Sequence, residues 1–210
     1  MTTITFAITV CDELIEFERL LQHILNQIGD NDEILIIKDK SKGDEKEFGK
    51  ICYKYLQNKN IQHKFVTTYL NKDFATFKNN IVTNATKDFI VQIDADEFIC
   101  TNFVTNLRQI FELNPQIDCY TVARENYVNG ITEQYLKQMS WRIDDKSRIN
   151  FPDRQFRIFK NNGKIFWKNP VHEVLDGWRI VSNLPEILFL MHVKSIDKQM
   201  SQNEFYAQNF

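Results

Sequence analysis

Short apolar segments alternate with amphipathic helical segments along the first half of the chain, and this alternation is the strongest constraint on its fold. Residues 4–10, 33–37 and 89–93 are apolar runs of strand length, rich in β-branched residues. Apolar residues at 14–28 recur instead at the spacing of one helix face. The same criteria predict strands at 62–67 and 119–122 and helices at 48–56, 74–85 and 103–111. The sequence therefore predicts an α/β fold, with a mostly parallel sheet covered by helices on both faces.

The pattern becomes less regular after about Ala123. Short strands are expected at 155–159, 165–167 and 187–193, and a terminal helix at 195–208. We find no linker rich in Ser or Gly and no internal repeat. We therefore expect a single domain over residues 1–210, in which a less regular half at 123–210 is appended to the half at 1–122 and closes over its sheet edge.

Composition excludes several classes of protein. The 26 Lys and Arg residues nearly balance the 28 Asp and Glu residues, which argues against a nucleic-acid partner. The four cysteines are widely spaced and indicate reduced thiols rather than a disulfide framework. The N-terminus has no basic segment followed by a long apolar one, and no apolar run approaches the roughly 20 residues of a membrane span. We expect a soluble, cytoplasmic protein without a transmembrane segment.

Acidic residues follow three of the expected strands, at the point where each strand ends. Glu13 comes just after the first strand, and Asp39 ends the second. Asp94 and Asp96 follow the fourth strand in the sequence Asp-Ala-Asp-Glu. Ligands of open α/β sheets bind outside the carboxyl ends of the strands. These carboxylates therefore predict a ligand site at that edge of the sheet.

The triplet Asp94-Ala-Asp96 allows two interpretations. Two carboxylates at a strand end can share a divalent cation, Mn²⁺ or Mg²⁺, and a ribose hydroxyl. Alternatively, they cap the next helix, because Asp is favoured in turns and first helical turns. A second Asp-x-Asp triplet, Asp30-Asn-Asp32, precedes a strand and so is expected at the opposite edge of the sheet.

Five motifs in order along residues 4–175 resemble family 2 glycosyltransferases of the GT-A fold. The segment from Asp73-Phe74 through Lys78-Asn79 to Asp-Ala-Asp-Glu is similar to a subgroup with an Asp-Phe-x-x-x-Arg-Asn helix. The end of the second strand, from 36 to 44, is similar to the Asp-x-x-Ser-x-Asp ending of the family. Residues 153–159, Trp167 and Val171-His-Glu173 resemble an Arg-x-x-Arg…Trp…Val-His-Glu block of the same subgroup.

The resemblance implies transfer of a sugar from a nucleotide-diphospho-sugar to an acceptor hydroxyl, with inversion of configuration and dependence on a metal. The half at 1–122 would bind the donor, and the half at 123–210 would bind a glycan, lipid-linked or protein acceptor and hold the catalytic groups. The residues expected to bind the nucleotide-sugar are Glu13, Asp39, Lys78, Asp94, Arg154 and Arg157. The residues expected to bind Mn²⁺ or Mg²⁺ are Asp96, His172 and Asp94. Lys78 stands where the family has Arg, and so lacks the bidentate guanidinium.

The chemistry also requires a general base that takes the proton of the acceptor hydroxyl. Glu173 is the first candidate and Asp153 the second. Arg154 and Arg157 either contact diphosphate or form ion pairs with the acidic cluster. Trp141 and Trp167 either stack on an acceptor sugar or pack in the core.

Two other functions remain open. One is a non-catalytic module that binds a nucleotide-sugar without turnover. The other is a sugar-phosphate nucleotidyltransferase, which is expected to have a Gly-rich phosphate loop after the first strand, where this chain has Cys11-Asp-Glu13. The remaining histidines, His23, His63 and His192, are expected to be structural.

Overall fold

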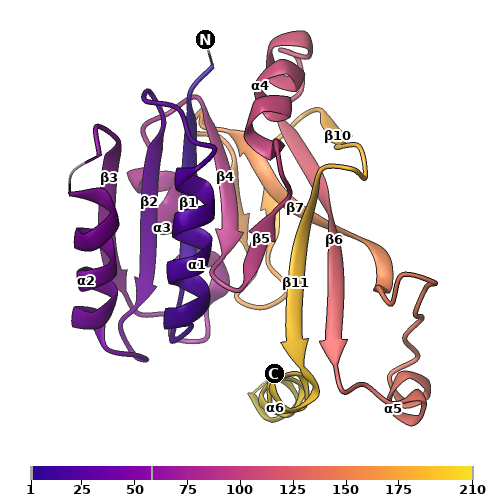
Figure 1. Cartoon of the computed structure of the whole chain (residues 1–210). Coiled ribbons are helices and arrows are strands. Elements are labelled where there is room, and N and C mark those ends of the chain that lie inside the picture. The colour runs from indigo at the N-terminus through magenta and orange to yellow at the C-terminus, as the bar shows by residue number, and fades with distance from the viewer. Residues whose placement is uncertain (1, 58, 210) are drawn as a thin grey trace.

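The computed structural model describes residues 2–57 and 59–209. In this part of the chain, nine strands form one mixed sheet in the order β3-β2-β1-β4-β7-β6-β11-β5, with β10 paired to β6 (Figure 1). The strands contributed by the first half are β1 (Ile4–Val10), β2 (Glu33–Asp39), β3 (Gln62–Thr68), β4 (Phe89–Asp94) and β5 (Glu97–Ile99). Those of the second half are β6 (Cys119–Asn129), β7 (Ile149–Lys160), β10 (Val181–Asn183) and β11 (Phe189–Ser195). A separate pair consists of β8 (Phe166–Lys168) and β9 (Val174–Asp176).

Helices cover both faces of the parallel part of the sheet. Strands β3, β2, β1 and β4 pair in parallel, and every residue of β1 and β2 is buried. On one face lie α1 (Leu14–Leu25), α2 (Glu45–Leu56) and α4 (Phe103–Leu113). On the other lie α3 (Phe74–Asn84) and the β8–β9 pair. The predicted α/β fold with a mostly parallel sheet is confirmed.

Successive residues of β1 enter two different cores. Phe6 and Ile8 join a cluster with Phe17 of α1, whereas Ala7 joins a cluster with Phe77 of α3 and Trp167 of β8. Because side chains alternate across a strand, a strand covered on both faces needs apolar residues at every position. This explains the uninterrupted apolar runs of the sequence.

The second half extends the sheet, which differs from the expectation that it closes over the sheet edge. Strand β7 pairs antiparallel with β4 and with β6, and β11 pairs in parallel with β6. The antiparallel β7 thereby satisfies the backbone groups along the open side of β4, which a covering segment would leave unpaired. The helices α5 (Glu133–Gln138) and α6 (Ile196–Asn209) follow β6 and β11 (Figure 1).

The pairing brings the ends of distant strands to one edge. Since β7 is antiparallel to both β4 and β6, strands β4, β6 and β11 run in the same direction. Their arrowheads point the same way in Figure 1, and α6 lies just beyond the end of β11. The beginning of β7 lies at this edge as well. No described helix is both long and apolar enough to cross a membrane.

Candidate functional site

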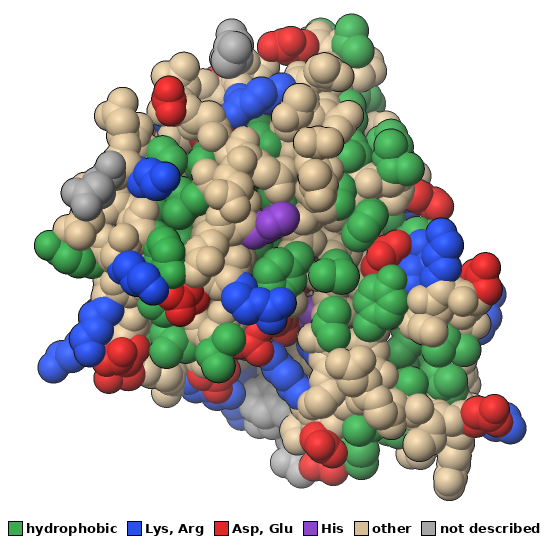
Figure 2. Space-filling model, viewed as in Figure 1, with side chains coloured by type: hydrophobic (Ala, Val, Ile, Leu, Met, Phe, Trp, Pro, Cys, Tyr) green, Lys and Arg blue, Asp and Glu red, His purple; other side chains and the backbone are tan. Residues whose placement is uncertain are grey.

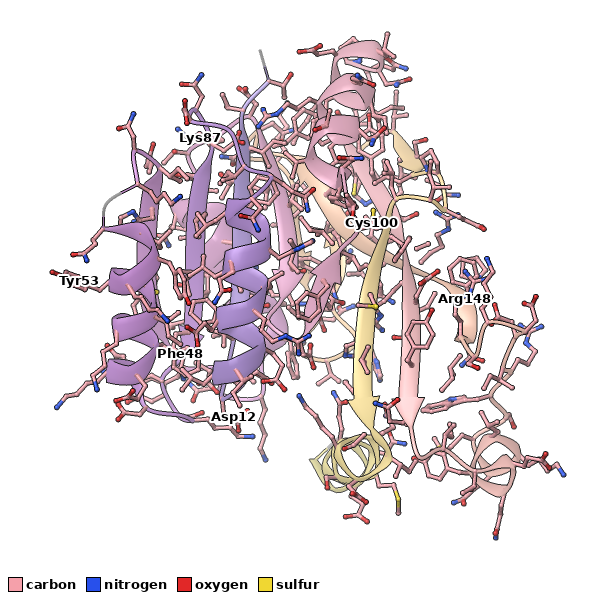
Figure 3. The ribbon with its side chains drawn as sticks, viewed as in Figure 1. Asp12, Phe48, Tyr53, Lys87, Cys100 and Arg148 are labelled. Atoms are coloured by element: carbon pink, nitrogen blue, oxygen red, sulfur yellow. The ribbon has the colours of Figure 1, made fainter. Side chains whose placement is uncertain are left out.

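A cavity of about 540 Å³ opens at the edge where β1, β4, β6 and β11 end. Figure 3 labels Asp12 at this edge, in the connection between β1 and α1. The cavity walls come from both halves of the chain, from α3 on one side to α6 on the other. The predicted residues that line it are Glu13, Lys78, Asp94, Asp96, Asp153, Arg157 and Glu173.

Asp94 and Asp96 belong to a tight turn between β4 and β5. The backbone N–H of Asp94 donates to Glu97 Oε2 at 3.0 Å. The next helix, α4, begins at Phe103 after Asn102, so neither carboxylate caps it. The helix-cap interpretation is wrong, and both side chains line the cavity.

Both carboxylate oxygens of Asp94 accept hydrogen bonds. Oδ2 accepts from Arg157 Nη2 at 2.7 Å, and Oδ1 accepts from Thr9 Oγ1 at 2.5 Å and Gln92 Nε2 at 2.8 Å. Burial raises the pKa of Asp94, but the charges of Arg157 and Lys78 and the Thr9 bond outweigh it and hold the pKa far below its usual range. Asp94 is therefore a fixed anion.

Asp96 lies beside His192, not His172. Its Oδ2 is 3.3 Å from His192 Nε2 and 3.4 Å from Lys198 Nζ. Burial raises the pKa of Asp96, but the hydrogen bond and the charge of His192 outweigh burial and hold this pKa below its usual range. His192 reaches Asp96 because β11 pairs with β5 in a register that sets His192 opposite Glu97.

The predicted grouping of His172 with Asp96 is absent from the structure. His172 is exposed, has a backbone φ of 53°, and does not line the cavity. His172 precedes Glu173 in the loop between β8 and β9, and of the two only Glu173 lines the cavity. Sequence proximity to Glu173 therefore did not bring His172 to the edge of the sheet where Asp96 lies.

Arg157 and Arg154 have different surroundings. Arg157 is only 4% exposed and bridges Glu97 Oε1 at 2.8 Å, Asp94 Oδ2 and Gln92 Oε1. Of the two interpretations of Arg157, the structure shows the one in which it forms ion pairs with the acidic cluster. Arg154 lies outside the cavity and donates to Leu184 O and Glu186 Oε1.

Lys78 and Glu173 form an ion pair across the cavity. Lys78 Nζ is 2.6 Å from Glu173 Oε1 and 4.7 Å from the ring centroid of Trp167. Trp167 is buried in the core beneath α3, so of its two predicted roles the structure shows core packing. Asn79 of α3 holds the backbone of β8 at Trp167, since the backbone N–H of Trp167 donates to Asn79 Oδ1 at 2.8 Å.

Asp153, the second candidate base, is held by several donors. Its Oδ2 is 2.7 Å from Arg124 Nη2 and accepts from Asn126, and its Oδ1 accepts from Gln155. Burial raises the pKa of Asp153, but the charge of Arg124 and these hydrogen bonds lower it overall. A carboxylate stabilised in this way is a weak proton acceptor.

Glu13 and Asp39 organise the loops that follow β1 and β2. Glu13 Oε2 accepts from the backbone N–H groups of Cys11 and Asp12, at the start of α1. Asp39 is 1% exposed and accepts from Ser41 and from the backbone N–H of Leu70. Although burial raises the pKa of Asp39, the hydrogen bonds of Ser41 lower it overall. Glu13 lines the cavity, whereas Asp39 lies behind its wall.

Several cavity residues were missed by the sequence reasoning. They are Thr9, Arg124, Asn126, Gln155, His192 and Lys194. All come from the part of a strand that lies at the same edge as Asp94. A polar residue near the end of an apolar strand is the sequence signal that could have indicated them. His192 is such a residue, in the strand expected at 187–193.

The donor atoms fit a divalent cation that is held partly by substrate. Within residues 2–57 and 59–209, no group of three or more His, Cys, Asp or Glu side chains is arranged to bind a metal. Mg²⁺ and similar ions are commonly bound by one or two carboxylates together with substrate phosphates. Asp96, with the imidazole of His192 beside it, supplies that smaller set.

Two solved structures, both under 25% identical to this chain, share its fold. S. aureus TarS 1-349 in complex with UDP-GlcNAc superposes with a TM-score of 0.59 at 14% identity, over 92% of this chain and 59% of that one. The mannosyltransferase PcManGT from Pyrobaculum calidifontis, in complex with GDP-Man and Mn²⁺, gives 0.50 at 15% identity, over 58% of this chain and 35% of that one. The present chain thus covers less than two thirds of either structure.

The family comparison covers most of the chain. No curated protein matches in sequence. The family described as glycosyl transferase family 2 matches residues 5–175, which include all of β1 except Ile4, the turn with Asp94 and Asp96, and Glu173. This chain belongs to glycosyl transferase family 2.

Proposed function

We propose that the chain is a metal-dependent glycosyltransferase domain that moves a sugar from a nucleotide-diphospho-sugar to an acceptor hydroxyl with inversion. One observation carries the proposal. A single cavity holds fixed anions at a strand end, Asp94 and Asp96, together with a carboxylate, Glu173, that is free of the hydrogen bonds that restrain Asp153. Family membership and the folds of the two nucleotide-sugar complexes support it.

The donor would occupy the end of the cavity formed by β1, β4 and α3. Glu13 and the turn that follows β1 line the cavity there and would face the nucleoside, and Asp39 holds the neighbouring loop behind them. Lys78 is the lining cation on α3 and would meet the diphosphate. Arg157 acts through Asp94, because its guanidinium is occupied by Asp94, Glu97 and Gln92.

Asp96 and His192 would hold the divalent cation together with the diphosphate oxygens. A bound Mn²⁺ or Mg²⁺ supplies a Lewis acid that neutralises negative charge on the leaving diphosphate. Asn126 supports this arrangement, since its Oδ1 lies 3.0 Å from His192 Nδ1 and orients the ring. Lys198 of α6 also forms an ion pair with Asp96.

Glu173 would act as the general base. It would take the proton from the acceptor hydroxyl while that oxygen attacks the sugar carbon and the bond to the diphosphate breaks. Lys78 Nζ donates to Oε1 of Glu173, and the Glu173 side chain lines the cavity. One carboxylate opposite the leaving group suits a single displacement, which inverts the configuration.

Thermal unfolding against a panel of nucleoside diphosphates, with and without Mn²⁺, tests the donor site. A ligand at 100 times its dissociation constant stabilises the folded state by about 2.7 kcal/mol. For a chain of this size the melting temperature should rise by roughly 5–10 °C. We expect this shift for one nucleotide with Mn²⁺, and its loss in Asp96→Ala.

Asp30→Ala is the matched control, because Asp30 belongs to the other Asp-x-Asp triplet and is exposed. It should keep the full shift. If no nucleoside diphosphate changes the melting temperature of the wild-type protein, the proposed donor site is wrong. An equal shift in Asp96→Ala and wild type would remove the metal from the proposal.

A further inference from the structure

Lys198, in the first turn of α6, reaches the carboxylate of Asp96. Its Nζ lies 3.4 Å from Asp96 Oδ2, and the same oxygen lies 3.3 Å from His192 Nε2. The two residues are 102 positions apart in the chain, so the contact joins the last helix to the turn after β4. An ammonium group therefore sits on the very oxygen that is shared with His192, the other group proposed to hold the divalent cation.

Negative charge surrounds Lys198. Burial lowers the pKa of Lys198, but the charges of Asp96 and Glu13 raise it overall. Acidic and basic side chains lie next to one another along the lower edge of the face viewed in Figure 2, where α6 is found in Figure 1. Lys198 is therefore an ammonium group at neutral pH, and it neutralises Asp96 in this structure.

The two carboxylates of the Asp-Ala-Asp turn differ in how firmly their cations are held. The Arg157 side chain is 4% exposed, and its Nη2 lies 2.7 Å from Asp94 Oδ2. The Lys198 side chain is 42% exposed, and its contact with Asp96 is longer. Ion pairs that reach solvent contribute little to stability, so breaking one costs little. Of these two cations, Lys198 is the one that can leave its carboxylate.

The helix that carries Lys198 is anchored independently of Asp96. Ser195 Oγ accepts a hydrogen bond from the backbone N–H of Lys198 at 3.2 Å, and Asn203 Nδ2 donates to the hydroxyl of Tyr135 at 2.8 Å. The side chain of Lys198 is a flexible stem that ends in a compact charge. The ammonium can therefore move away from Asp96 while the backbone of α6 stays in place.

We infer that Lys198 is an internal counter-ion of Asp96, which opposes binding of a divalent cation until the nucleotide is present. The inference rests on the proposed function, because it concerns the metal of that site. Two cations at one carboxylate oxygen repel each other, so the ammonium must leave Oδ2 when a divalent cation binds there. A bound diphosphate supplies new negative charge that the displaced ammonium can face. Nucleotide and cation should therefore bind cooperatively, and Lys198 should be a source of that coupling.

Direct titration with Mn²⁺ tests this inference without any measurement of turnover. Free Mn²⁺ is measured by electron paramagnetic resonance as the whole chain is titrated in the absence of nucleotide. We expect Lys198→Met to bind Mn²⁺ about fivefold more tightly than wild type, because the competing ammonium is gone. Lys198→Arg keeps the charge and should bind Mn²⁺ no more tightly than wild type.

Lys137→Met is the matched control. Lys137 lies on α5, is exposed, and does not line the cavity, so this variant removes the same charge elsewhere. It should keep the wild-type affinity for Mn²⁺. The melting temperature of each variant without ligand shows whether it is folded.

The coupling is measured by a second titration. UDP, GDP, ADP and CDP are each titrated into the protein with and without saturating Mn²⁺, with allowance for Mn²⁺ bound to free nucleotide. For the nucleotide that binds, Mn²⁺ should tighten its binding in wild type. In Lys198→Met this factor should be about fivefold smaller, because coupling between two ligands is reciprocal.

Three results would overturn the inference. They are an affinity for Mn²⁺ that is no higher in Lys198→Met than in wild type, an equal gain in Lys137→Met, and a coupling factor that Lys198→Met leaves unchanged. If nucleotide binding still depends on Mn²⁺ and on Asp96 in that case, the proposed function stands and only this inference fails. If neither wild type nor Lys198→Met binds Mn²⁺ with or without nucleotide, this inference and the metal dependence of the proposed function both fail.

Discussion

Lys78 Nζ lies 2.6 Å from Glu173 Oε1, so the cation that we propose for the donor diphosphate and the carboxylate that we propose as the base form one ion pair. The side chain of Lys78 is 8% exposed and that of Glu173 is 18% exposed. A diphosphate that binds Lys78 must therefore share its ammonium with Glu173. This relationship links occupancy of the donor site to the surroundings of the base.

Replacing Lys78 should weaken nucleotide binding. In Lys78→Met, the diphosphate loses its cation on α3 and Glu173 loses its partner. Truncating one member of a buried charge pair costs at least about 2 kcal/mol, so we expect the dissociation constant to rise by about thirtyfold or more. Lys78→Arg keeps the charge and should stay within a few-fold of wild type. Calorimetric titration with the nucleoside diphosphate measures both, and unchanged affinity in Lys78→Met would exclude this contact.

Replacing Glu173 should affect chemistry without affecting donor binding. Glu173→Gln removes the proton acceptor at nearly constant shape, and general bases contribute about 10²–10⁴-fold to a rate. We expect kcat to fall by that factor while the nucleotide-induced melting shift persists. Asp153→Asn should lower kcat much less, because Arg124 and two amides already occupy that carboxylate. A larger loss of kcat in Asp153→Asn than in Glu173→Gln would identify Asp153 as the base. Nucleotide binding without any turnover in the wild-type protein would favour a non-catalytic binding module.

Sequence periodicity predicted the parallel half of the fold, because burial on both faces of a strand leaves a pattern within that strand's own sequence. Residues 4–10 coincide with β1, and the strand expected at 89–93 ends one residue before the observed end of β4. A strand buried on both faces leaves an apolar run that needs no knowledge of its partners. The position of Asp94 and Asp96 at the edge of the sheet that carries the cavity followed from that run and from the rule for parallel sheets.

Long-range pairing explains what the sequence did not reveal. His192 faces Asp96 because β11 pairs with β5, two strands that are separated by more than 85 residues in the chain. The register that sets His192 opposite Glu97 has no local signature, whereas Val-His-Glu at 171–173 offered a conspicuous but exposed histidine. The short strands β5, β9 and β10 and the helix α5 were missed because three to six residues carry too little periodicity.

The two arginines of the Arg-x-x-Arg segment should differ in their effect on stability. Arg157→Met leaves the carboxylates of Asp94 and Glu97 buried without their shared cation, which typically costs about 3–5 kcal/mol. Arg154→Met removes only a partly exposed contact with Glu186 and Leu184 and should cost about 1 kcal/mol or less. Urea denaturation measures both free energies of unfolding. Equal losses would mean that the buried network around Asp94 does not stabilise the fold.

The hydroxyl of Tyr120 should make stability fall at high pH. Tyr120 is 2% exposed, its ring packs 5.6 Å from that of Phe111, and its buried hydroxyl makes no hydrogen bond with a described residue. Burial raises the pKa of Tyr120 to about 12. An unfolded tyrosine ionises near pH 10, so between about pH 10 and 12 the unfolded chain releases a proton that the folded one retains. Alkali therefore favours unfolding there, by up to about 1.4 kcal/mol per pH unit.

Tyr120→Phe removes this contribution and keeps the ring. Its free energy of unfolding should fall less steeply than that of wild type from about pH 10 to 12. Near neutral pH it should equal or exceed that of wild type, because the variant no longer buries an unpaired hydroxyl. Tyr53→Phe is the matched control, since Tyr53 is 68% exposed and should reproduce the wild-type slope. Urea denaturation at a series of pH values measures all three slopes. Parallel slopes for wild type and Tyr120→Phe would show that the Tyr120 hydroxyl has a partner or ionises without unfolding the chain.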